Sequence, residues 1–368
     1  MRVPDMNWQL RSIESHALED DIPGLARTLG VPPLVARLLW LRGIRTESRA
    51  RRFLSPKLAD LSPPEGLPDL DKATERLARA IRSGERIAVC GDYDVDGMTG
   101  TALLVRFFRL AGADVTWSIP HREKDGYGLS VATVERLAED GVQIAVTVDN
   151  GSTAIEPIRR AVELGMDVVI TDHHLAGGEL PPAYAIVNPQ LPGGSEAAQR
   201  LCGCGLAFKL AWAIADTLRG RGVNAGELKA FLRDAMGLVA LATVCDVVPL
   251  VDENRVLVAT GLAALRRSPH PGIRALLDVS DLGRLPLTTE DVGFKLGPRL
   301  NAAGRLSRPD LVVDLLTETD AARCEALAKE LDQANRTRRQ VEAGVLRQAD
   351  EQAQELVNSR NPSALVLW

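Results

Sequence analysis

The sequence is poor in aromatic residues and has no long hydrophobic run. Phe, Trp and Tyr make up 4% of the 368 residues, which argues against a broad surface for stacking nucleic-acid bases. No segment reaches the ~18 consecutive apolar residues that a membrane-spanning helix needs. The first residues, MRVPDMNWQLRSIESHALEDD, lack the apolar core of a signal peptide. We therefore expect a protein that does not enter a membrane.

An excess of positive charge and a disulfide framework are missing as well. The chain has 44 basic and 49 acidic residues, a formal net charge of -5, so its overall charge does not indicate a nucleic-acid partner. Five cysteines, an odd number scattered along the chain, are typical of reduced thiols and predict a cytoplasmic protein. Any nucleic acid would have to be bound locally, by clustered arginines and by metal ions.

Residues 86–171 alternate between short β-rich runs and helix-like stretches. We expect strands at 86–90, 114–119, 143–149 and 167–171, and helices at 99–112, 131–141 and 154–165. Strands that alternate with helices of this length predict an α/β fold with a doubly wound, mainly parallel sheet.

The rest of the chain is expected to be mostly helical. Residues 1–65 form an N-terminal helical segment, and residues 66–316 hold the α/β region followed by a helical second half. Residues 317–360 predict a long connector helix, whose thin apolar stripe among many charges favours a spacer between two bodies. The last residues, 361–368, look like the first strand of a further domain, so we expect the chain to be a fragment.

The segment VCGDYDVDGMTG (89–100) places Asp92, Asp94 and Asp96 at every second position. The spacing resembles the start of a calcium-binding loop. However, the twelfth position of such a loop would be Leu103 rather than Glu, and a strand rather than a helix precedes it. A solvated acidic turn is the plain alternative. Because the motif follows a predicted parallel strand, where open α/β sheets bind ligands, we favour a metal site.

Further metal-binding side chains follow other predicted strands. Asp149 ends the strand in VTVDNGS, and Asp172, His173 and His174 end the next one in VITDHH. Asp246 lies between two apolar runs in LATVCDVVPL, where an unpaired carboxylate would be costly to bury. Carboxylate and imidazole groups that converge on one sheet edge suit Mn²⁺ or Mg²⁺, with Zn²⁺ as a further option.

Polar side chains of a Gly-rich segment could bind phosphate. They are Arg299, Asn301 and Arg305 of GPRLNAAGRL (297–306), which we expect to form a loop. The alternative is a helix-cap loop with surface arginines. Arg122 is a weaker candidate for the same role, and a plain surface residue is as good an interpretation. The CGCG segment (202–205) lacks partner ligands for zinc, and its glycines predict close backbone packing.

These segments together resemble the DHH phosphoesterase superfamily, named for the triplet at 172–174, and within it the RecJ family of single-strand-specific DNA exonucleases. The resembling segments, in chain order, are RGIRTESRARRFLSP, GDYDVDGMTGTALL, DGYGL, VDNGS, ITDHH, NPQ, GLAFKLA, CDVVPL and GPRLNAAGR. The resemblance covers nearly the whole chain, and the combination is specific although each segment alone is not. It implies a C-terminal DHH-associated domain that would begin where this chain stops.

The resemblance also implies a role for each residue of the site. It makes Asp94 a ligand of a first metal, Asp149 the carboxylate that bridges two metals, and Asp96, His173 and Asp246 ligands of the second. His174 would contact the scissile phosphate, and Asp92 and Asp172 would orient the ligands and imidazoles. Cys90 stands where some relatives place a metal-binding His, so the first metal would have fewer protein ligands.

The function that follows is a 5′→3′ exonuclease on single-stranded DNA in repair and recombination, using two Mn²⁺ or Mg²⁺ ions to activate water. Single-stranded DNA would be its partner, and a single-strand-binding protein or a helicase is a further candidate. One alternative is a phosphodiesterase of short oligonucleotides or cyclic dinucleotides. An alternative of another class is a non-catalytic relative that binds DNA or a replication partner.

Overall fold

The computed structural model describes residues 12–14, 17–122, 126–219, 224–283, 286–305, 308–360 and 364–366, without the side chains of 305 and 358–360. The chain divides into two compact units, Met1–Leu61 with Leu250–Val256 and Ser62–Pro249 with Leu257–Trp368. The sequence placed the first boundary at residue 65. Residues 361–363, 367 and 368, most of the expected final strand, lie outside the described residues. Among the described helices, none combines the length and the apolar character of a membrane span.

The first unit is helical, as its sequence predicts. Its elements are η1 (Ala17–Asp21), α1 (Ile22–Leu29), α2 (Pro33–Leu41), α3 (Glu47–Leu54) and η2 (Leu58–Asp60). Helix α3 begins at Thr46, whose hydroxyl accepts a hydrogen bond from the Arg49 N–H, a favourable start for a helix. Apolar side chains of the three α-helices, among them Leu25, Ala36 and Ala50, form a small core of their own.

The second unit contains one sheet of five parallel strands in the order β2-β1-β3-β4-β5. The strands are β1 (Ile87–Gly91), β2 (Val115–Ser118), β3 (Ile144–Val148), β4 (Asp167–Thr171) and β5 (Ala185–Val187). The first four match the predicted strands. Strand β5 is not predicted from the sequence, because its three residues, shortly after Pro181 and Pro182, form too short a pattern. Register places Gly91 beside Val148 and Val148 beside Thr171, so three neighbouring strands end at one level.

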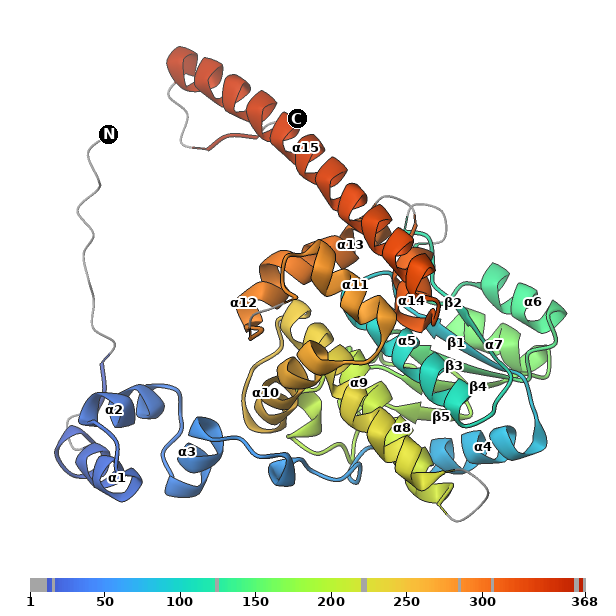
Figure 1. Cartoon of the computed structure of the whole chain (residues 1–368), viewed down its shortest axis with the longest axis horizontal. Helices are drawn as coiled ribbons and strands as arrows, with labels where there is room; N and C mark the ends of the chain where they lie inside the picture. The colour runs from blue at the N-terminus through green and yellow to red at the C-terminus, as the bar shows by residue number, and fades with distance from the viewer. Residues whose placement is uncertain are drawn as a thin grey trace. The chain divides into compact units, whose positions relative to one another are not determined.

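Helices cover both faces of this sheet, which confirms the doubly wound α/β fold (Figure 1). On one face, α6 (Val131–Glu139) and α7 (Ile155–Glu163) share a buried apolar cluster with the strands. The helices of the other face are α4 (Leu70–Ser83), α5 (Val95–Leu110) and α8 (Gly203–Thr217), with α9 (Ala225–Cys245) packed against α5 and α8. Helix α5 therefore connects the sheet to the helical second half.

The helical second half confirms the prediction in outline and corrects it in one place. Its further elements are η3 (Ala198–Arg200), α10 (Asp252–Arg267), α11 (Pro271–Val279), α12 (Thr289–Asp291), η4 (Val292–Leu296), α13 (Gly297–Arg305), α14 (Asp310–Thr317) and α15 (Ala321–Arg360). The Gly-rich segment expected as a loop is helix α13. Leu300 and Ala303, one turn apart, are fully buried, and this burial outweighs the weak helix propensity of its glycines.

The connector helix α15 has 40 residues, and the prediction of a spacer is wrong for its first turns. Cys324, Ala328 and Leu331 are fully buried, because their spacing puts them on one helix face that packs against α11, α13 and α14. Farther along, Val341 and Val345 are each 60% exposed, as expected of a helix that projects into solvent. Figure 1 shows this second part extending beyond the helices around it.

Gly100 allows α5 to approach both β3 and α8. A Cβ atom at this position would lie 2.6 Å from Val148 Cγ1 and 3.1 Å from Cys204 Cα. We expect Gly100→Ala to lower the free energy of unfolding by roughly 1–3 kcal/mol through overpacking, although Ala is the better helix former. Gly344→Ala is the matched control, because a Cβ there meets nothing within 4 Å; it should leave stability unchanged or slightly higher. Urea denaturation measures both, and equal effects of the two variants would contradict this account.

Candidate metal centre

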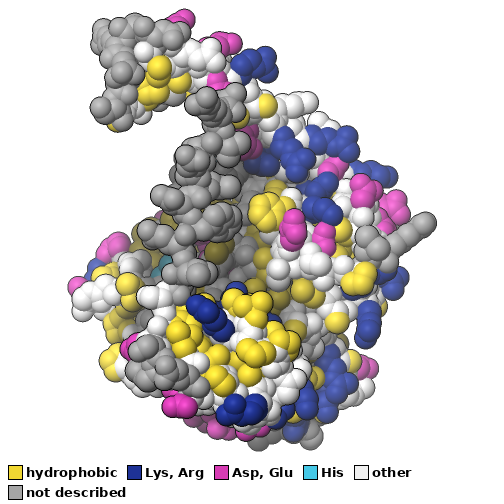
Figure 2. Space-filling view, turned by 90° about the vertical axis from the view of Figure 1, so that its left-hand side faces the viewer, with side chains coloured by type: hydrophobic (Ala, Val, Ile, Leu, Met, Phe, Trp, Pro, Cys, Tyr) yellow, Lys and Arg dark blue, Asp and Glu magenta, His cyan; other side chains and the backbone are white. Residues whose placement is uncertain are grey.

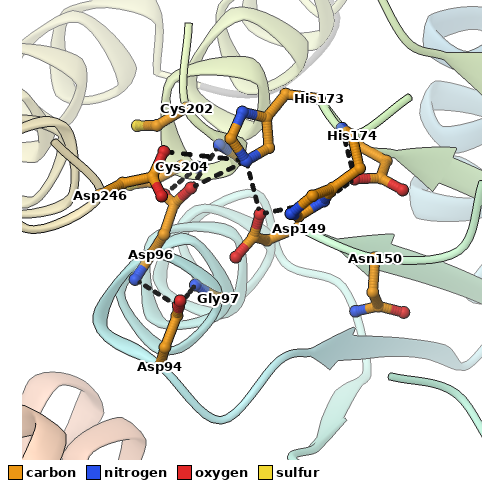
Figure 3. A network of polar contacts seen from close by, with 12 residues as sticks. Asp94, Asp96, Gly97, Asp149, Asn150, His173, His174, Cys202, Cys204 and Asp246 are labelled. Carbon is orange, nitrogen blue, oxygen red and sulfur yellow. Dashed lines mark hydrogen bonds and ion pairs between the residues drawn. The ribbon is translucent and has the colours of Figure 1, made fainter. Parts of the chain in front are cut away.

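Seven acidic and imidazole side chains meet at the carboxyl edge of the sheet. Since β1, β3 and β4 end at one level, the residues that follow them lie side by side. They are Asp92, Asp94 and Asp96 after β1, Asp149 after β3, and His173 and His174 after β4. Asp246 reaches the same place from the C-terminal end of α9, as Figure 3 shows. The chain thus brings together groups that lie up to 154 positions apart (92 to 246).

Helix N-termini hold two of the three carboxylates that follow β1. Asp94 begins α5, and its Oδ1 accepts hydrogen bonds from the Asp96 N–H (2.9 Å) and the Gly97 N–H (3.1 Å). Asp96 is almost fully buried, and its two oxygens accept from the Gly203 N–H (2.6 Å) and the Cys204 N–H (2.7 Å) at the start of α8. The partial positive charge of both helix ends favours the ionised carboxylates.

The side chains form overlapping groups with the spacing of metal ligands. His173 Nε2 lies 3.0 Å from Asp149 Oδ1, and 3.8 Å from both Asp96 Oδ2 and Asp246 Oδ2. Potential ligand atoms within 4.8 Å of one another make three sets: Asp92, Asp94 and Asp149; Asp96, His173 and Asp246; and Asp149, His173 and His174. Asp149 and His173 belong to two sets each, so the groups adjoin.

Three buried polar atoms that lack a hydrogen-bond partner among the described residues indicate whether the site fits metal ions. Asp149 Oδ1, His173 Nε2 and Asp246 Oδ2 are inaccessible to solvent, and no described residue forms a hydrogen bond with them. Although His173 Nε2 and Asp149 Oδ1 are close, they do not meet in hydrogen-bonding geometry. Their 3.0 Å separation matches two neighbouring ligands of an octahedral ion with bonds of about 2.1 Å. Because unpartnered buried groups are costly, the site fits a cation.

Burial and mutual repulsion raise the pKa values of the carboxyl groups. Burial, more than the neighbouring charges, raises the pKa of Asp92 and of Asp96 to about 7 each and that of Asp246 to about 6. The pKa of Asp149 is raised well above its ordinary value by burial first and then by Asp96 and Asp94. Divalent cations would reverse these shifts, since an adjacent positive charge favours the ionised form.

The pKa values of the two neighbouring histidines are shifted in opposite directions. Burial, followed by the charge of His174, lowers the pKa of His173 to about 4, so its imidazole is neutral, the form that binds metals. His174 Nδ1 lies 2.8 Å from Asp172 Oδ1, and this hydrogen bond raises the pKa of His174. Burial acts to raise the pKa of Asp172, but hydrogen bonds from His174 and from the Ser152 N–H lower it overall. Asp172 therefore orients His174 and stabilises its charged form.

Backbone geometry at Asp149 depends on a glycine of the CGCG segment. Asp149 has φ 63°, a left-handed conformation that non-glycine residues rarely adopt. A Cβ at Gly203 would lie 2.5 Å from Asp149 Cβ, so only glycine lets α8 come this close. The neighbouring thiols of Cys202 and Cys204 have pKa values raised well above normal, mainly by burial. The segment serves close packing and holds Asp96 through its backbone.

Sequence reasoning assigned no role to three polar residues that support the site. The Tyr127 hydroxyl lies 2.9 Å from the Asp149 carbonyl oxygen, to which it donates, and 3.4 Å from His174 Nδ1. Asn150 Nδ2 donates to the carbonyls of Val148 and Cys90, and Asn188 Nδ2 donates to the His174 carbonyl (2.9 Å). Tyr127, Asn150 and Asn188 lie in DGYGL, VDNGS and NPQ, segments that the sequence comparison had already singled out, and this was the signal that could have identified them. Cys90 is buried, and burial raises the pKa of its thiol to about 12, so it stays protonated.

The four candidate phosphate ligands outside the metal cluster have different environments. Arg299 donates from Nε to Asp332 Oδ1 (2.9 Å) and from both terminal nitrogens to the carbonyls of Lys295 and Val279. Each of the three guanidinium nitrogens thus already has one acceptor inside the protein, and phosphate binding by Arg299 stays a prediction. Asn301 lines a cavity. The Arg305 side chain lies outside the described residues. Arg122 stacks over Tyr93 at 5.1 Å, beside Tyr127.

Comparisons with known proteins agree with this geometry. The model of the DHH family, N-terminal domain, matches residues 86–243. The single-stranded-DNA-specific exonuclease RecJ of Bacillus subtilis is 39% identical over 343 residues, which are 93% of this chain and 41% of that protein. RecJ of Thermus thermophilus, crystallised with Mn²⁺, superposes with a TM-score of 0.75 at 34% identity, covering 93% of this chain and 46% of the other. The chain thus spans less than half of each of these two proteins.

A third protein is matched over most of its length. An exonuclease RecJ bound to manganese superposes with a TM-score of 0.69 at 38% identity, covering 79% of this chain and 70% of that one. The match to the DHH family model, together with a parallel sheet that carries carboxylates and imidazoles at its carboxyl edge, places the chain in the DHH class. Within that class, the chain belongs to the RecJ family.

The raised carboxyl pKa values predict how the metal-free protein responds to pH. These carboxyl groups bind protons more tightly in the folded chain than in the unfolded chain. Their ionisation therefore lowers the free energy of unfolding. This loss is absent below about pH 4, where they are protonated in both states, and complete above about pH 7. The melting temperature in EDTA should therefore fall between pH 5 and pH 8, and Mn²⁺ should raise it more at pH 8 than at pH 5.

Asp149→Asn should flatten this pH dependence because it removes one of the repelling charges, whereas Asp71→Asn, at an exposed position of α4, should not. Thermal melts of the three proteins at a series of pH values provide the measurement. If the melting temperature of Asp149→Asn falls with rising pH as steeply as that of the unmodified chain, the carboxylates of the cluster do not repel one another.

Proposed function

We propose that the chain is a metal-dependent exonuclease that hydrolyses phosphodiester bonds of single-stranded DNA from the 5′ end. The observation that supports this most is the meeting of Asp149, His173 and Asp246 with unpartnered buried atoms that face one another. The related structures with Mn²⁺ belong to RecJ exonucleases. Mn²⁺ is therefore the first ion to test, with Mg²⁺ as the second, which a further Thermus thermophilus RecJ structure contains.

Each residue of the cluster takes a role in this proposal. Asp94 would hold the first ion, Asp149 would be shared, and Asp96, His173 and Asp246 would hold the second; a ligand atom of Asp92 lies within 4.8 Å of those of Asp94 and Asp149. When bound, two divalent ions supply Lewis-acid activation of water and offset the negative charge of the reacting phosphate. The protein keeps these carboxylates fixed through the N-termini of α5 and α8, so little reorganisation is needed during the reaction.

His174 acts on the substrate in this proposal. Its Nδ1 is engaged by Asp172, and half of its side chain is exposed. The opposite ring nitrogen, Nε2, therefore carries a proton in the charged form that the raised pKa favours. A protonated Nε2 can donate a charge-assisted hydrogen bond to a phosphate oxygen. Asp172 and Tyr127 position the imidazole for this contact.

The proposal also includes the binding partners of the protein and its location in the cell. We take single-stranded DNA as the substrate, and a single-strand-binding protein or a helicase as a candidate partner. The five cysteines are unpaired in the structure, which supports the cytoplasm as the place of action. No observation favours hydrolysis of dinucleotides or a non-catalytic role, since every expected metal-binding position carries a competent side chain.

Labelled strands test the substrate and the polarity. Incubation with Mn²⁺ should release mononucleotides from the 5′ end of single strands, leave blunt duplexes intact, and stop in EDTA. Asp149→Ala should lower kcat at least roughly 10³-fold, because it removes the shared carboxylate, while Asp71→Ala retains activity. Products from the 3′ end, or activity confined to dinucleotides, would contradict the proposal.

Variants of the neighbouring residues His173 and His174 should separate metal binding from substrate binding. His174→Ala should lower kcat about 10²- to 10³-fold, the usual effect of losing one positioned donor, while Mn²⁺ affinity stays within a few fold. His173→Ala should instead weaken Mn²⁺ binding, because it removes a ligand. Isothermal titration with Mn²⁺ alone measures affinity without turnover. Equal losses of Mn²⁺ affinity in both variants would show that His174 is a ligand as well.

A further inference from the structure

A cavity of about 690 Å³ lies next to the candidate metal centre. Cys245 and Val247, which line it, flank Asp246 in the chain, and Asp246 Oδ2 lies 3.8 Å from His173 Nε2. Its other walls come from α12, η4, α13 and one side chain of α15. The volume is within the range of small-molecule and cofactor sites. The cavity therefore adjoins the chain segment that carries Asp246, one of the candidate metal ligands.

Two large apolar side chains at this cavity are exposed to solvent. Phe294 is 73% exposed and Val247 is 83% exposed, whereas apolar residues of this size are usually buried. The chain has only six Phe residues, and an exposed aromatic ring offers its face to a planar ligand. Figure 2 shows one face of the molecule, on which hydrophobic side chains lie among charged side chains of both signs.

The backbone at Val247 is strained. Its φ of 59° lies in the left-handed region, which a β-branched residue rarely adopts. The side chain is exposed, so burial of its own methyl groups does not offset the strain. Strain of this kind gathers at ligand-binding and catalytic positions. It fixes the direction of the chain directly after Asp246 and keeps the Val247 side chain at the cavity wall.

The remaining walls combine a close-packed floor with a polar edge. A Cβ at Gly297 would lie 2.6 Å from Cys245 Sγ, so glycine is needed for α13 to meet the end of α9. Asn301, Thr289 and Glu290 also line the cavity, with an amide, a hydroxyl and a carboxylate. Arg338, 27% exposed, donates to Glu342 Oε2 (2.9 Å) and to Asn335 Oδ1 (3.2 Å). An apolar wall with amide and hydroxyl groups at its edge is the chemistry that binds a nucleobase.

We propose that this cavity binds one nucleobase of the DNA strand, next to the scissile phosphate, with Phe294 as the stacking partner and Val247 as the opposing apolar contact. The proposal rests on the function proposed above and specifies how the same site holds its substrate. Charge also favours stacking here, because Arg299 is occupied by Asp332 and the chain carries a net charge of -5. A base can stack without any phosphate contact.

A set of single strands, each with one abasic residue at a successive position from the 5′ end, tests this proposal. Binding is measured by fluorescence anisotropy with Ca²⁺, under conditions in which no product forms. For the unmodified chain, an abasic residue at one position should weaken binding between about 5-fold and about 150-fold, the range for one stacked base. Abasic residues at the other positions should have little effect.

Variants connect that position to the aromatic ring. Phe294→Ala should bind the intact strand as weakly as the unmodified chain binds the strand that is abasic at the sensitive position. Its binding should no longer depend on where the abasic residue lies, and Phe294→Trp should restore both the affinity and this dependence. Val162→Ala on α7, where Val162 is 48% exposed, is the matched control and should behave like the unmodified chain. Equal effects at every position, or position dependence that survives in Phe294→Ala, would overturn the proposal.

The same measurements separate this proposal from the proposed nuclease activity. Position-dependent binding that requires Phe294, without any hydrolysis in Mn²⁺, would support the base site and refute the exonuclease. Normal hydrolysis with no effect of Phe294→Ala on KM or on abasic discrimination would refute the base site and leave the exonuclease standing.

Discussion

The structure depends on holding several carboxylates close together in a place that water hardly reaches. Asp96 and Asp149 are almost fully buried, and their mutual repulsion and burial raise both pKa values. Such an arrangement opposes folding unless protons or cations neutralise it. The fold supplies part of the compensation through the helix N-termini that bind Asp94 and Asp96. The unpartnered atoms of Asp149 and His173 indicate that metal ions supply the rest.

That constraint explains why the elements around the site pack so closely. Parallel strands that end at one level bring Asp92, Asp149 and Asp172 to neighbouring positions, but they do not fix the side chains. Helices α5 and α8 do so, and they can approach only because Gly100 and Gly203 carry no side chain. The sheet thus determines which residues meet, and the glycines determine how closely. A substitution at Gly100 would act on the metal centre without touching a ligand, whereas a Cβ atom at Gly203 would collide with Asp149 itself.

The sequence predicted those parts of the fold and site that depend on local pattern. Alternating strands and helices gave the sheet, and polar residues after three strands gave the cluster. It did not predict β5, which is too short, or helix α13, whose helical pattern Gly and Pro obscured. Nor could it show that Asp332 binds Arg299, or that the backbone of residues 203 and 204 binds Asp96. These contacts join distant segments, and no local pattern encodes them.

The proposed substrate raises a further electrostatic question, because single-stranded DNA is a polyanion that would have to approach a cluster of acids on a chain of net negative charge. Divalent ions would change the sign of the local charge, and a protonated His174 would add to the positive charge. Away from the ions, repulsion persists, so an attraction that does not depend on charge has an advantage there. The exposed ring of Phe294, beside the cavity that adjoins Asp246, offers such an attraction. Stacking would hold the base while the ions hold the phosphate, and a duplex, whose bases are already stacked on one another, could not use this contact without first opening.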